Sequence, residues 1–281
     1  MTIGDDVSTA ATLSTRPIRA AINCIRRDTD IEPRVTYSGG AEPQIFNDAY
    51  ALATVDIEDA RNSERRFALD VNGFEWAKRP TAFNAFDDES AISNVYYDEV
   101  AAIIREITGT KDVFVFDHTV RRGLTESTRK PAYHVHNDYT EETGRTRARE
   151  VLGEEIVVKM EGRRMLQINV WRPLNDVVKR SPLAFCDASS VKRADLVATK
   201  IYFPETDRTG EILALRRASD QRWWYIPAMT KDEVVLIKGY DTKRDGVARF
   251  TPHTAFEFPD DLQEHDAPPR ESIEARAFAF Y

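Results

Sequence analysis

The second half of the chain is a series of short segments rich in β-branched and aromatic residues, and this pattern restricts the fold more than any other feature. Turn residues separate the segments. The strand candidates are residues 112–122, 131–139, 164–174, 181–187, 210–215, 222–227, 232–241, 248–258 and 270–281. Short strands at this spacing are typical of a barrel or jelly roll. We therefore expect a mainly β fold with flanking helices (α+β), a double-stranded β-helix of the jelly-roll, cupin-like type.

The first part of the chain predicts an extension in front of this barrel. Residues 1–15 are small and polar without usable periodicity, which indicates a flexible arm. The dipeptide Asn72-Gly73 is favoured in the turn between two antiparallel strands. Three strand candidates are expected to form an amino-terminal sheet: residues 17–25, 34–38 and 67–79.

Two helical regions interrupt the strands. Apolar residues recur at three- and four-residue spacing from about Asp88 to Thr108, and Gly109 is suited to end this helix. A shorter helical insert is expected around residues 141–162. Because no repeat or linker divides the pattern, residues 16–281 are expected to form one domain.

Composition excludes several classes of partner. The chain has 281 residues, and 39 basic against 47 acidic side chains leave a net charge of −8, which repels nucleic acid. No apolar run approaches the roughly 20 residues that cross a bilayer. Cys24 and Cys186 form no CxxC pair and follow no secretory leader, so a reducing cytoplasm is expected. A homodimer is left open.

A metal site is predicted from three separated residues. His136 and Asp138 stand two apart on an extended segment, so their side chains point to the same face. His253 lies far along the chain, on what we expect to be the first strand of a final hairpin. Two imidazoles and one carboxylate are the facial ligand set of non-haem iron(II) oxygenases and leave three positions open.

The last strand candidate predicts an anion site beside the metal. Its alternation puts Arg270, Ser272, Glu274 and Arg276 on one side, which should be the barrel interior. A guanidinium fork suits the far carboxylate of a dicarboxylate, and a serine hydroxyl adds a hydrogen bond. Symmetric pairing of the final hairpin, with its loop at about 260–269, would put Arg276 level with the metal and Arg270 nearer the loop.

Several of these segments together resemble a known family. They are HNDYT with Gly144 and Arg145, QINVWRPL, PLAFCDASSV, DEVVLIKGYD, ARFTPHTAF and RESIEAR. The ordered set is similar to the fungal and bacterial hydroxylase/desaturase family of secondary metabolism, which includes a cephamycin 7α-hydroxylase component, aspergillic-acid-type hydroxylases and the gibberellin desaturase. The likeness runs from about Val55 to the carboxyl terminus.

The resemblance implies an iron(II)- and 2-oxoglutarate-dependent dioxygenase that hydroxylates or desaturates a small molecule with dioxygen. His136, Asp138 and His253 match the metal positions of that family. The substrate is not implied, because the members act on different scaffolds.

Other residues near these motifs are candidates for weaker roles. Asn169 and Gln167 could line the pocket and contact the cosubstrate, whereas Trp171 shares a face with Asn169 and is expected to fill the core or to touch substrate. Tyr139 and Arg147 follow the metal motif and are candidates for substrate contact. Histidines 134 and 118 are expected to pack rather than bind metal, and Cys186 to be an inert buried thiol.

Three alternatives remain open on the residues alone. The same ligands could hold zinc or manganese for hydrolysis or isomerisation. The barrel could bind a small molecule without catalysis. A non-haem iron oxidase could also take its electrons from substrate and ignore 2-oxoglutarate, in which case no succinate would form.

Overall fold

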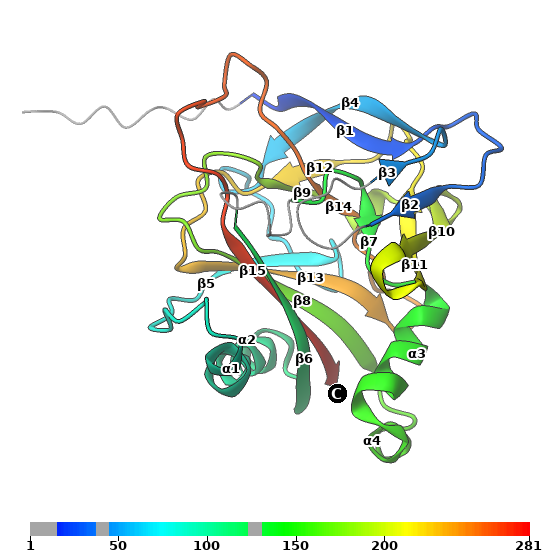
Figure 1. The fold of residues 1–281 in the computed structure, drawn as a ribbon, viewed down its shortest axis with the longest axis vertical. Helices are drawn as coiled ribbons and strands as arrows, with labels where there is room; N and C mark the ends of the chain where they lie inside the picture. Colours follow the sequence, from blue (N-terminus) through cyan, green and yellow to red (C-terminus); the bar gives the residue numbers. More distant parts are fainter. Residues whose placement is uncertain (1–15, 38–44, 123–130) are drawn as a thin grey trace, which may run out of the picture.

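The computed structural model describes residues 16–37, 45–122 and 131–281, and two facing sheets dominate it (Figure 1). In this described part ten strands form the larger sheet, in the spatial order β1 (Ile18–Ile25), β4 (Tyr50–Asp59), β12 (Trp223–Tyr225), β9 (Leu183–Cys186), β14 (His253–Ala255), β7 (His136–Asn137), β11 (Arg208–Leu215), β10 (Leu196–Phe203), β2 (Arg34–Thr36) and β3 (Ile45–Phe46). Five strands form the smaller sheet, in the order β5 (Phe74–Lys78), β13 (Glu233–Asp241), β8 (Met165–Pro173), β15 (Ser272–Phe280) and β6 (Asp112–Arg121). The predicted double-stranded β-helix is confirmed.

Helices cover the outer face of the smaller sheet and one end of the barrel (Figure 1). The helical elements are α1 (Glu89–Ala91), the π-helical turn η1 (Ile92–Tyr96), α2 (Tyr97–Thr108), α3 (Glu141–Leu152) and α4 (Glu154–Lys159), with short 3-10 turns η2 (Ala188–Ser190), η3 (Arg193–Asp195) and η4 (Pro204–Thr206). Asp88 caps the first of them, and Gly109 ends α2 with a φ of 74°. Both predicted helical regions are confirmed. No helix in the described part of the chain is long and apolar enough to span a membrane.

Strand alternation decides which side chains enter the barrel. On β15 the alanines 275, 277 and 279 pack with Ile273 under α2, and the small residues let helix and sheet approach closely. The other face of β15 therefore points inward, as predicted. On β8, Arg172 points to the helix side, where it donates to Tyr96 and Glu99, whereas Asn169 and Trp171 face the other way.

Two predicted hairpins and the predicted amino-terminal sheet are wrong. Residues 67–73 form turns rather than a strand, and β5 pairs with β13. Strands β14 and β15 belong to different sheets, so His253 and Arg276 are not hairpin partners. Strands β1 and β2 lie in the larger sheet and β5 in the smaller one, and β4 and β10 were not predicted. The predicted arm, residues 1–15, lies outside the described residues.

Gly73 explains why its dipeptide is not a hairpin turn. Its φ is +83°, and a Cβ there would lie 2.2 Å from Thr251 Oγ1. That hydroxyl lies 2.8 Å from the carbonyl oxygens of both Gly73 and Lys238. The glycine thus permits the close approach of the segment that leads into β14, where His253 lies.

An ion cluster ties β13 to the residue before β8 and to the turn that contains Asp70. Lys238 and Asp241 are both fully buried, with Lys238 Nζ 2.9 Å from Asp241 Oδ2. Arg164 binds Asp241 and Asp70. Lys238 also pairs with Asp70.

Asp241→Ala should lower the free energy of unfolding by about 3–5 kcal/mol, because it leaves a buried ammonium group short of a partner. Chemical denaturation measures this change. Glu264→Ala, which removes the exposed ion pair with Lys179, is the control and should change stability little. Equal losses in both variants would contradict the role assigned to the cluster.

Candidate active site

The three predicted metal ligands converge at the meeting point of two short strands. His253 of β14 is the direct antiparallel partner of His136 in β7. Asp138 directly follows β7, and its side chain points to the same side as that of His136. One nitrogen from each histidine and one carboxylate oxygen all lie within 4.8 Å of one another. The structure thus brings the three predicted ligands together, and their binding of a metal ion stays a prediction.

Backbone carbonyls set the orientation of both imidazoles. His136 Nδ1 lies 2.8 Å from the carbonyl oxygen of His134, and His253 Nδ1 lies 2.9 Å from that of Thr251. Since a carbonyl oxygen can only accept, Nδ1 carries the proton in each ring. The Nε2 lone pairs are therefore free to bind a cation. Burial, and then His253, lowers the pKa of His136 to about 4, which keeps that ring neutral near pH 7.

Asp138 is held so that one of its oxygens is occupied by protein. Asn169 Nδ2 donates to Oδ2 at 2.7 Å, and Arg276 Nε lies 3.5 Å from the same atom. The other oxygen, Oδ1, lies 3.5 Å from His136 Nε2. Although burial alone would raise it, Arg276 and His136 hold the pKa of Asp138 well below its usual range. The carboxylate thus offers a single oxygen to a metal.

Arg276 is saturated by partners. Its Nη2 lies 3.2 Å from Glu274 Oε1, and its Nη1 donates to Thr119 at 2.9 Å and to Asp117 at 3.3 Å. With Asp138 it therefore contacts three carboxylates. Arg276 is level with the metal ligands as predicted, but it stands on the opposite sheet rather than across a hairpin.

Gln167 and Asn169 form a buried support beneath Asp138. Gln167 Nε2 donates to Asn169 Oδ1 at 2.6 Å, and Asn169 Nδ2 also donates to Glu274 Oε1 at 2.6 Å. Neither residue is among those that line the adjoining cavity. Close packing is required here, because a Cβ at Gly239 would lie 1.9 Å from Gln167 Oε1.

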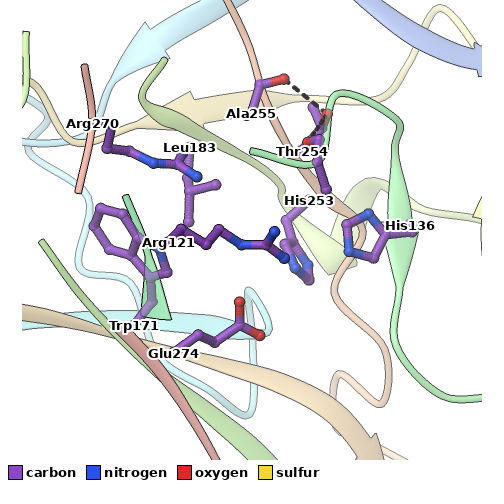
Figure 2. A pocket seen from close by; sticks show the side chains of 10 residues that line it. Arg121, His136, Trp171, Leu183, His253, Thr254, Ala255, Arg270 and Glu274 are labelled. Carbon is purple, nitrogen blue, oxygen red and sulfur yellow. Dashed lines mark hydrogen bonds between the residues drawn. The ribbon is translucent and has the colours of Figure 1, made fainter. Parts of the chain in front are cut away.

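Two open spaces meet at the metal ligands. A small cavity of about 20 Å³ is lined by His136, His253, Trp171, Glu274 and Arg270 among others (Figure 2). A larger cleft of about 660 Å³ is lined by His136 and Asp138, and it shares Arg121, Ala132 and His136 with the small cavity. A cation held by the triad would therefore face both spaces.

The residues predicted to touch cosubstrate or substrate divide between these spaces. Arg270 and Trp171 line the cavity, with the Arg270 guanidinium 5.5 Å from the Trp171 ring centroid. Ser272 is buried on the same strand but does not line the cavity. Tyr139 and Arg147 line the cleft.

The histidines and the cysteine expected to be bystanders lie outside the ligand set. His134 is buried and stacks on His136, with 4.5 Å between ring centroids. His118 Nδ1 lies 2.9 Å from the Tyr97 hydroxyl, and its Nε2 pairs with Glu89. Cys186 is buried, and burial raises the pKa of its thiol far above the usual value. The two histidines are packed and the cysteine is buried, as predicted.

Two residues that shape the site were not predicted. Asn137 lies between His136 and Asp138 in the sequence and is fully buried, and its side chain bonds three backbone groups. Arg121 lines both the cavity and the cleft. A search for polar residues flanking the ligands would have found Asn137, whereas Arg121 depends on a strand irregularity that no local pattern reveals.

The triad can be tested by metal loading. His136→Ala and His253→Ala should each reduce bound iron(II) well below the one equivalent expected of the wild type, since two remaining ligands hold the ion weakly. Metal analysis after anaerobic loading and desalting measures this. His265→Ala, which changes an exposed histidine, is the control. Retention of one equivalent in both variants would contradict the site.

The support under Asp138 gives a second test. Asn169→Leu should weaken iron(II) binding by about 10- to 100-fold, because loss of a group that orients a ligand typically has this effect. A competition titration with a chelator measures the affinity. Asn62→Leu, at an exposed asparagine whose side chain donates to Asp59, should leave the affinity unchanged. Equal affinities would mean that Asp138 holds its orientation without Asn169.

Comparison with known proteins identifies the family. Residues 25–280 match the family model described as "Oxidoreductase/YMDC permease-like domain". The hydroxylase/desaturase CTB9 of Cercospora beticola is 34% identical over 256 residues, which cover 83% of this chain and 78% of that protein. The Fe(II)/2-oxoglutarate-dependent dioxygenase nvfI of Aspergillus novofumigatus is 31% identical over 254 residues, which cover 88% of this chain and 89% of that protein.

A solved structure supports the same assignment. The iron and alpha-ketoglutarate-dependent endoperoxidase NvfI matches with a TM-score of 0.83 and 27% identity, over 95% of this chain and 99% of that one. The likeness extends over both sheets. The chain therefore belongs to the oxidoreductase family of this model and to the hydroxylase/desaturase and iron(II)/2-oxoglutarate-dependent dioxygenase family of these relatives.

Proposed function

We propose that this protein is an iron(II)- and 2-oxoglutarate-dependent oxygenase that hydroxylates or desaturates a small molecule in the 660 Å³ cleft. His136, Asp138 and His253 are the iron ligands, and Arg270 holds the distal carboxylate of the cosubstrate. The single observation that carries the proposal is a one-carboxylate, two-imidazole set that opens into two separate spaces.

The donor set fits iron(II) rather than a structural ion. Two neutral imidazole nitrogens and one carboxylate oxygen leave half of an octahedron open. The second oxygen of Asp138 is taken up by Asn169 and Arg276, which supports monodentate binding. Iron(II) with 2-oxoglutarate and dioxygen supplies the oxidant that removes hydrogen from an unactivated carbon. The chain contributes orientation, cosubstrate capture and exclusion of water.

Arg270 is better suited than Arg276 to bind the cosubstrate. It is only 3% exposed, and its Nη1 donates to the carbonyl of Ser181 at 2.6 Å. Its Nε has no hydrogen-bond partner, and no ion pair joins it to a carboxylate among the described residues. A buried charge of this kind is costly unless an anion accompanies it. Arg276, in contrast, already contacts three carboxylates.

The other predicted cosubstrate residues receive different parts in this proposal. Ser272, two residues after Arg270, begins strand β15 and supports the strand there. Asn169 and Gln167 orient Asp138. Trp171 forms a flat wall under the Arg270 guanidinium. Tyr139 and Arg147 contact substrate from the cleft side.

The compartment and the assembly are also part of the proposal. Cys24 and Cys186 are buried free thiols, which suits the reducing cytoplasm. Dioxygen and a small-molecule substrate are the partners that the activity needs, and a homodimer is the oligomer that size-exclusion chromatography with light scattering would test.

Anaerobic addition of 2-oxoglutarate to the iron(II) protein should produce a weak visible charge-transfer band, and turnover with dioxygen should release succinate. Absence of both from protein that binds iron would overturn the cosubstrate assignment.

Arg270→Gln should weaken 2-oxoglutarate binding by at least tenfold, since removing one partner of a buried charge pair costs about 2–5 kcal/mol. Titration of the same band measures this. Arg149→Gln, at an exposed arginine of α3, is the control and should bind as the wild type does.

A further inference from the structure

We propose that Arg121 is a second arginine of the cosubstrate site, which binds the iron-chelating end of the 2-oxo acid and separates the cosubstrate cavity from the substrate cleft. This inference rests on the proposed function. It assigns a binding role to a residue at the end of β6, in the sheet that faces the strands of the two histidine ligands.

A bulge in β6 brings Arg121 inside the barrel. Asp117 pairs with Arg276 and Val115 with Ala277, so Phe116 has no partner on β15. Such an extra residue shifts the alternation of a strand by one. Phe116 stacks on Phe278, and Asp117 and the residues two and four positions later then face Arg276 and the cavity.

Arg121 and Arg270 share one small cavity. Figure 2 shows the Arg121 side chain extending across it toward His253, with Arg270 at the other end. Burial, and then the nearby Arg121, lowers the pKa of Arg270 to about 10. The cavity carboxylate, Glu274, is already engaged by Arg276 and Asn169. Two cations brought together in this way favour a ligand with two negative charges.

The size of the cavity requires one wall to move. About 20 Å³ is room for roughly one water molecule, far less than 2-oxoglutarate occupies. Trp171 and Leu183 belong to the hydrophobic core, and Arg270 is bonded to Ser181. Arg121 is half-buried and ends its strand. Because it also lines the cleft, it can lean into that open space without disturbing the core.

A position between the two spaces has a functional consequence. With the cosubstrate in the cavity, a displaced Arg121 guanidinium would lie between it and the cleft and would be available to the carboxylate next to the keto group. Arg270 and Arg121 then recognise opposite ends of one ligand. A 2-oxo acid that lacks the distal carboxylate can therefore distinguish the role of Arg270 from that of Arg121.

The test compares 2-oxoglutarate with 2-oxopentanoate, which lacks the distal carboxylate, by titrating the visible band of the anaerobic iron(II) protein. Arg270→Gln should weaken binding of 2-oxoglutarate at least tenfold and leave 2-oxopentanoate within about twofold. Arg121→Gln should weaken binding of both acids by the same factor, at about tenfold. Arg121→Lys should recover part of this loss. Iron content and melting temperature should match the wild type in all variants.

The outcomes separate this inference from the proposed function. If Arg121→Gln leaves both affinities within twofold of the wild type, or weakens only that of 2-oxoglutarate, the role of Arg121 is refuted while the cosubstrate assignment stands. If the iron-loaded wild type binds neither acid, both are refuted.

Discussion

The side chain of Asn137 donates to the carbonyls of Tyr139 and Gly239 and accepts from the Thr251 backbone N–H, each at 2.8 Å. It thereby joins the segment of Asp138, the strand β13 of the opposite sheet and the segment that leads to His253. Strands β7 and β14 share only one residue pair. Without this buried amide the two halves of the ligand set would have little to hold them in register, so the metal site depends on a residue that cannot itself touch the metal.

The charged side chains around the metal ligands balance both before and after iron(II) and the cosubstrate bind together. Arg121, Arg270 and Arg276 are matched in number by Asp117, Asp138 and Glu274, while the histidines are neutral ligands. Iron(II) adds two positive charges, and 2-oxoglutarate brings two negative ones. Binding of the two together therefore leaves this balance unchanged, whereas either one alone would leave two charges uncompensated in a largely buried site.

Local patterns were sufficient for the ligands and for the class of fold. Spacing of two on an extended segment put His136 and Asp138 on one face, and alternation put Arg270 and Arg276 inside the barrel. The pairing of strands distant in sequence could not be predicted, because hydrophobic alternation is the same whichever sheet a strand joins. The final hairpin was therefore wrong, yet Arg276 was correctly placed level with the metal because β15 crosses the site from the facing sheet.

Irregular backbone explains what alternation missed. The bulge at Phe116 places two consecutive residues of β6 on the inner side, and the unpaired Gly239 in β13 lies against Gln167 and offers its carbonyl to Asn137. Each irregularity costs ladder hydrogen bonds and has no distinctive sequence signal. Both occur where a functional side chain must be supported or redirected. In a barrel whose strands are otherwise regular, the departures from regularity are therefore the features that distinguish a reactive centre from a packed core.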